Sequence, residues 1–76
     1  MENNIIKIIQ DYIVVDEKVR LESKLIEDLN VDSLQMMAIL SEIEALKNVQ
    51  ISYSKLRDVI TVQDLINCVE RKKYGN

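Results

Sequence analysis

Asp32 and Ser33 are the residues of this chain best suited to take part in a reaction, because they stand where a polar segment meets an apolar repeat. An exposed serine hydroxyl beside an aspartate can act as a nucleophile or accept a group from another protein. The chain has no histidine, one cysteine and no glycine-rich loop. These absences exclude a Ser-His-Asp triad and leave no ligand set for zinc. We therefore predict no catalytic residue and no metal site, and we expect Ser33 to be modified rather than to catalyse.

The element that positions Ser33 is a predicted helix that starts at Asp32. Asp32 as N-cap with Gln35 three residues later is a variant of the capping box. Asn48 is expected to end the helix. Helical spacing predicts a buried stripe at Met36, Ile39, Leu40, Ile43 and Leu46. Ser and Asp are also common at ordinary helix starts, so the pair alone has a purely structural interpretation.

Three further segments complete the predicted fold. A helix over residues 3–14, capped by Asn3 or Asn4, would bury Ile5, Ile6, Ile9, Tyr12 and Ile13. One short helical turn is expected over 54–59. A last helix, capped by Thr61 with Asp64 at its third position, would bury Val62, Leu65, Ile66 and Val69.

These segments predict a single all-α domain over residues 1–76. The expected architecture is a small four-helix bundle with a short third helix and a long loop between helices one and two. That loop runs from Val15 to Val31 and ends beside Ser33. Long loops in compact domains tend to be functional.

The helix that follows Ser33 has a second face with an unusual composition. A solvated helix face is normally rich in Lys and Glu. This face has small or apolar residues and acids only at its borders, which predicts a docking surface for partners. Its members are Leu34, Met37, Ala38, Ser41, Glu44 and Ala45. The alternative is a helix that is buried on two sides.

The charge of the chain constrains its partners. The net charge is −3 and the pI is about 4.8, which argues against nucleic acid. Between Lys24 and Lys47 the sequence has five acidic residues and no basic one, which would favour a basic partner. We find no signal peptide and no run long enough to span a membrane. The chain is therefore expected to be cytoplasmic, and we expect a monomer.

The extended motif around Ser33 resembles that of acyl carrier proteins. It reads Glu27-Asp28-Leu29-x-x-Asp32-Ser33-Leu34, followed at suitable spacing by Ile51 and by Ile60-Thr61-Val62. The resemblance covers nearly the whole chain. It implies that a phosphopantetheinyl transferase joins 4'-phosphopantetheine to Ser33, with Asp32 near the metal and phosphates during transfer. The thiol of the arm would then carry acyl or aminoacyl thioesters between loading and transferring enzymes that recognise helix two and the preceding loop.

Several positions depart from the family pattern. Fatty-acid carriers usually place several acids on helix two. At the matching positions this chain has Gln35, Ala38 and Ala45, and only Glu44 remains. Asn30 replaces a common glycine and can still adopt a positive φ. The loss of acids favours a dedicated pathway, for example polyketide-like or aminoacyl-loading, over housekeeping fatty-acid synthesis.

Three functions remain open on the sequence alone. The leading one is a carrier without catalysis of its own. The second is a helical interaction module of similar fold whose serine is never modified. The third is a small enzyme, which the missing acid–base residues disfavour.

Overall fold

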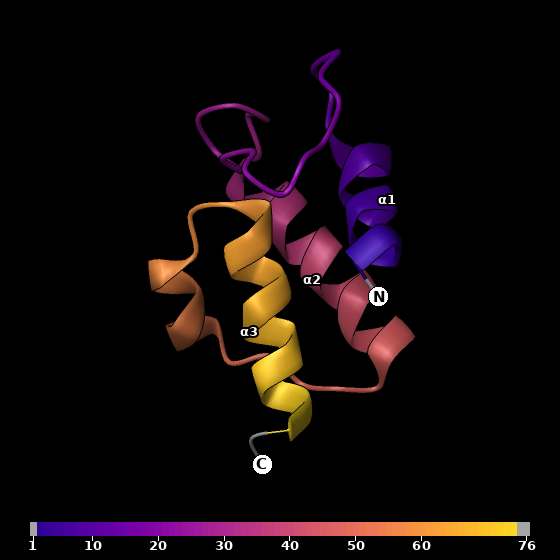
Figure 1. Cartoon of the computed structure of the whole chain (residues 1–76), viewed down its shortest axis with the longest axis vertical. Coiled ribbons are helices and arrows are strands. Elements are labelled where there is room, and N and C mark those ends of the chain that lie inside the picture. The colour runs from indigo at the N-terminus through magenta and orange to yellow at the C-terminus, as the bar shows by residue number, and fades with distance from the viewer. Residues whose placement is uncertain (1, 75–76) are drawn as a thin grey trace.

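Three α-helices and one 3-10 helix form the fold of residues 2–74, the part of the chain that the computed structural model describes. They are α1 (Glu2–Tyr12), α2 (Ser33–Lys47), η1 (Tyr53–Asp58) and α3 (Val62–Tyr74). α1 packs against α2 and α3, and η1 packs against α3. Figure 1 shows the long α1–α2 loop across one end of this bundle. The all-helical prediction is confirmed, but the short third helix is a 3-10 helix rather than an α-helix.

The core lies between the three α-helices and the inner side of the long loop. All four predicted residues of α3 are buried, and so are Ile39, Leu40 and Ile43 of α2. From α1, the predicted Ile5 and Ile9 are buried, and so is Ile8, which was not predicted. The loop adds Val19, Leu25, Leu29 and Val31. The connection is therefore part of the core and is held in place by it.

Three details of the predicted helices are wrong. α1 begins at Glu2, so Asn3 and Asn4 lie inside the helix and do not cap it. It ends at Tyr12, before the predicted Val14. Leu46 is 53% exposed, because Ile43 is the last buried residue of α2 and the core ends one turn before the helix does.

The start of α3 is closed by its own cap and by the long loop. Asp64 N–H donates to Thr61 Oγ1, and Thr61 N–H donates to Asp64 Oδ2, which is the predicted capping box. Val62 N–H donates to the Ser23 carbonyl (3.0 Å), and Gln63 N–H donates to the Leu21 carbonyl (2.9 Å). The first-turn N–H groups of α3 therefore all have protein partners.

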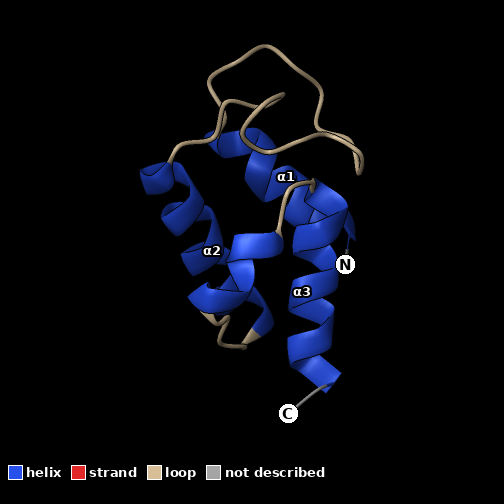
Figure 2. Ribbon diagram, turned by 90° about the vertical axis from the view of Figure 1, so that its left-hand side faces the viewer, coloured by secondary structure: helices blue, strands red, loops and turns tan. Residues whose placement is uncertain are grey.

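This closure also affects the charge of the cap. The backbone N–H groups of Thr61 and Ile60 both donate to the Asp64 carboxylate, at 3.0 Å each. They stabilise its charged form and lower the pKa of Asp64 below its ordinary value of 3.8. Figure 2 shows the loop above the ends of the helices where α2 and α3 begin.

Candidate functional site

The site is built at the first turn of α2. Asp32 has extended backbone (φ −96°, ψ −179°), and its Oδ1 accepts from Gln35 N–H at 2.7 Å. Gln35 Oε1 accepts from Asp32 N–H at 3.1 Å in return. The predicted capping box is confirmed, and the predicted helix end is confirmed too, because Asn48 is the C-cap with a left-handed backbone.

Ser33 is the first residue of this helix, and its side chain is exposed. The first N–H groups of a helix have no acceptor inside the helix. Here Asp32 accepts from Gln35 N–H through its side chain and from Met36 N–H through its carbonyl. The N–H groups of Ser33 and Leu34, one and two residues after Asp32, have no acceptor within the helix. These two donors and the positive end of the helix dipole favour an anion beside the hydroxyl of Ser33.

Two contacts fix this turn against the rest of the protein. Gln35 Nε2 donates to the Tyr12 carbonyl at 2.9 Å, which ties the start of α2 to the end of α1. On the loop side, Val31 N–H donates to the Leu25 carbonyl, and Asn30 takes a positive φ of 56°. Asparagine tolerates this region better than most residues, so Asn30 serves where the sequence comparison expected glycine. Ser33 is thus an exposed hydroxyl on a fixed backbone.

A groove of about 700 Å³ opens beside Ser33. Asn30, Asp32 and Ser33 form its polar edge. Its apolar lining comes from the loop, α2 and η1: Ile26, Val31, Met36, Met37, Leu40, Leu56 and Val59. An attached group that extends from Ser33 would therefore have an apolar surface next to it.

The sequence matches the family described as "Phosphopantetheine attachment site" over residues 3–69. The chain belongs to the acyl carrier protein family. The attached group in this family is 4'-phosphopantetheine, which confirms the predicted cofactor. The geometry at Ser33 fits such a group, because a phosphodiester needs an exposed hydroxyl for attachment and gains from unpaired N–H donors.

Curated relatives agree with this assignment. The chain is 33% identical over 64 residues to an acyl carrier protein of Campylobacter concisus, which covers 84% of this chain and 83% of that one. It is 34% identical over 65 residues to an acyl carrier protein of Campylobacter lari, covering 84% of each. A solved structure described as an acyl carrier protein of Mycobacterium tuberculosis matches with a TM-score of 0.82 and 28% identity, covering 91% of this chain and 93% of that one.

The second face of α2 in this acyl carrier protein is largely open to solvent. Leu34 is 79% exposed and Met37 is 53% exposed, while Ser41 and Ala45 are exposed and Ala38 is half-buried. The alternative of a helix buried on two sides is therefore wrong. Glu44, the acid of the predicted docking set, is half-buried, and its Oε2 accepts from Ile51 N–H at 2.7 Å.

One exposed apolar residue near the site was missed. Ile26 is 70% exposed and borders the same groove as Ser33 and Met37. A signal for it exists in the sequence. Leu25 and Leu29 are four residues apart and both buried, so the residue next to Leu25 in such a turn points elsewhere.

Over residues 2–74, no group of three or more cysteine, aspartate or glutamate side chains could hold a metal ion. In the same residues, no helix is both long and apolar enough to cross a membrane. Cys68 is half-buried, as expected for a packing residue of α3.

Proposed function

We propose that Ser33 is the residue of this acyl carrier protein that receives 4'-phosphopantetheine. The observation that carries the proposal is the exposed hydroxyl of Ser33 at the open first turn of α2. In the transfer, a bond forms between Ser33 Oγ and the pantetheine-bearing phosphorus of coenzyme A. The pyrophosphate bridge breaks, the nucleotide half leaves, and the hydroxyl proton goes to a base on the transferase.

The other four serines are less suitable acceptors. Ser23 is buried, and its Oγ accepts from Arg20 N–H. Ser52 and Ser54 hydrogen-bond to each other through their hydroxyls at 2.8 Å. Ser41 is exposed but lies in the third turn of α2, where the backbone N–H groups are used inside the helix.

The division of labour follows from what the chain contains. Ser33 supplies the acceptor, and Asp32 stands beside it to support the metal and phosphates that the transferase brings. The terminal thiol of the arm carries acyl groups as thioesters. Acid–base chemistry is left to the partner enzymes: a phosphopantetheinyl transferase and enzymes that load and transfer acyl groups. The chain itself is proposed not to be an enzyme.

The cargo is proposed to be apolar. The groove beside Ser33 is lined mainly by aliphatic and thioether side chains, and among its described lining residues Asp32 alone is charged. Burial of hydrocarbon contributes about 25 cal/mol per Å² of apolar surface, whereas a buried unpaired ammonium group is costly. An acyl chain therefore suits the groove better than an aminoacyl group does. The missing acids on α2 support a dedicated pathway for that acyl group.

Intact-mass spectrometry tests the attachment residue. The apo protein, coenzyme A and a broad-specificity phosphopantetheinyl transferase are expected to give one phosphopantetheine mass increment. Ser33→Ala should abolish the increment completely, while Ser41→Ala, an exposed serine on the same helix, should leave it unchanged. Absence of any increment on the wild-type chain would instead favour the unmodified interaction module.

A further inference from the structure

Three exposed apolar side chains gather around Ser33. Leu34 and Met37 are three residues apart on α2, so they are neighbours on its surface. Ile26, from the loop, borders the same groove as Met37 and Ser33. Single exposed apolar residues are ordinary, whereas a group of them beside a modification site indicates a contact surface. We call Ile26, Leu34 and Met37 the apolar patch.

The helix surface around this patch is neutral. From Ser33 to Ser41, α2 has no charged residue. Charged side chains return at Glu42, Glu44 and Lys47, in the second half of the helix. A partner that approaches Ser33 along α2 therefore meets apolar and small side chains first.

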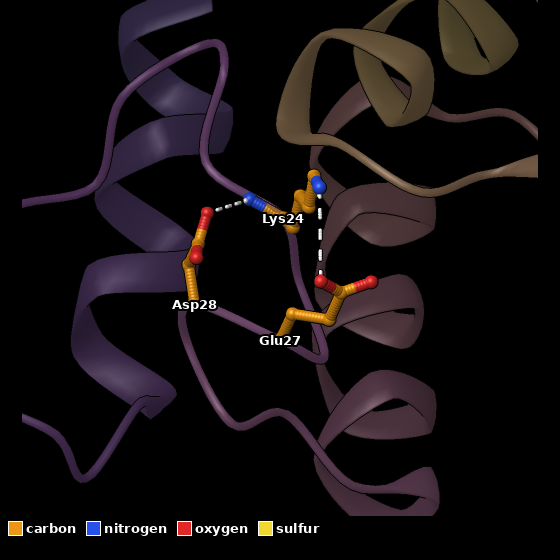
Figure 3. Close-up of polar contacts among 3 residues, drawn as sticks. All are labelled: Lys24, Glu27 and Asp28. Carbon is orange, nitrogen blue, oxygen red and sulfur yellow. Dashed lines mark hydrogen bonds and ion pairs between the residues drawn. The ribbon is translucent and has the colours of Figure 1, made fainter.

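The loop acids near the patch are already engaged within the protein. Figure 3 shows Lys24 between two of them: its Nζ lies 3.6 Å from Glu27 Oε1, and its backbone N–H donates to Asp28 Oδ2 at 2.8 Å. The third acid, Asp32, accepts from Gln35 N–H as the cap of α2. Backbone hydrogen bonds orient Asp28 and Asp32, while the exposed Glu27 forms a surface ion pair with Lys24.

The two acids on α2 are engaged in the same way. Glu42 Oε1 accepts from the Tyr12 hydroxyl at 2.8 Å, which joins α2 to α1 and raises the pKa of Tyr12. Glu44 Oε2 accepts from Ile51 N–H and holds the segment after α2. Each acid that at first suggested a basic partner therefore has a contact within the protein, and none of them lies on α2 before Glu42.

We infer that the enzymes acting on this carrier bind beside Ser33 through an apolar, uncharged surface that covers Ile26, Leu34 and Met37. This inference rests on the proposed function. Charge complementarity carries it: a lysine or arginine of a partner placed over this patch would lose water without meeting a carboxylate on α2. An apolar partner surface has no charge to desolvate there and gains the burial of three large side chains.

One substitution gives opposite results for the two kinds of partner. Met37→Glu places a carboxylate in the patch, so an apolar partner should bind more weakly and a basic one more tightly. The assay measures the KM for the carrier chain in phosphopantetheine transfer from coenzyme A, with a broad-specificity transferase as the probe. We expect KM to rise about tenfold or more, which corresponds to the lost burial of one methionine side chain.

Leu46→Glu is the matched control. Leu46 is also on α2 and, like Met37, is 53% exposed, but it lies about 14 Å further along the helix axis and on the opposite side. It should leave KM unchanged. Circular dichroism of both variants should match wild type, and if Met37→Glu lowers the helix signal, Leu34→Glu replaces it in the same assay.

Ionic strength provides a second readout. Between about 0.05 M and about 0.5 M NaCl, KM for the wild-type chain should change by less than about twofold, because screening acts on exposed charge pairs and not on apolar contacts. A rise in KM of about tenfold with salt, or equal KM values for Met37→Glu and Leu46→Glu, would overturn the inference. Either result leaves the proposed function intact, since only a missing mass increment on wild type removes that.

Discussion

The starts of α2 and α3 both have a capping box, but the two helix starts have different roles. Each has a polar N-cap that accepts from the third helical residue, and each third residue returns a hydrogen bond to the cap backbone. At α3, the next two N–H groups donate to carbonyls of the long loop. At α2, the corresponding N–H groups of Ser33 and Leu34 have no acceptor within the helix, and both residues are exposed.

The difference shows that a capping box alone does not make a binding site. The loop passes over α3 and fills its first turn, and the first residue there, Val62, is fully buried. The same loop then ends at Asp32 and leaves the first turn of α2 uncovered. With Ser33 as the proposed attachment site, the function of the fold depends on which helix start the loop closes and which it leaves open.

The largest expected effect concerns the loop that closes α3. Leu25→Ala removes a side chain that is 1% exposed and should lower the free energy of unfolding by about 2–5 kcal/mol. Ile26→Ala, at the exposed neighbouring position, should change it by no more than about 0.5 kcal/mol. Urea denaturation measures both. Similar losses for the two variants would mean that the loop is not anchored through Leu25.

The two caps should separate stability from transfer. Thr61→Ala removes the α3 cap, so it should cost about 1 kcal/mol of unfolding free energy and leave the transfer rate unchanged. Asp32→Asn keeps a good cap but removes the charge beside Ser33, so stability should hold while transfer slows about tenfold or more. Urea denaturation and the mass-increment assay measure the two properties. If both variants changed the same property, the two helix starts would not differ in role.

The smallest expected effect is a pH dependence of stability that comes from Asp64 at the start of α3. The pKa of Asp64 is lower in the folded protein than its ordinary 3.8, so folding favours the ionised form. This contribution is present above the ordinary pKa and is lost as the pH falls through the lowered folded value. Asp64→Asn should therefore flatten the acid side of the stability curve below about pH 4, measured by urea midpoints. Parallel curves for the two proteins would contradict the assigned hydrogen bonds.

Much of this organisation was predictable because it depends on local spacing. Both capping boxes, the buried stripe of α3 and the exposed position of Ser33 follow from residue types three or four apart. The family motif then gave the cofactor. The failures are at ends and surfaces: α1 begins earlier than its asparagines suggested, and Leu46 continues the stripe of α2 beyond the end of the core.

The parts that could not be predicted depend on contacts between distant segments. Nothing in the local sequence shows that the Leu21 and Ser23 carbonyls meet the start of α3, or that Tyr12 and Ile51 engage the acids of α2. The charge pattern alone suggested a basic partner. The tertiary contacts show that those acids have internal roles, which shifts attention to the apolar patch.

The most direct test is to map the modified residue by fragmentation of peptides from the phosphopantetheinylated protein. The account predicts the increment on Ser33 alone among the five serines of the chain. An increment on Ser41, Ser52 or Ser54, or one shared among serines, would contradict the claim that the open first turn of α2 is the attachment site.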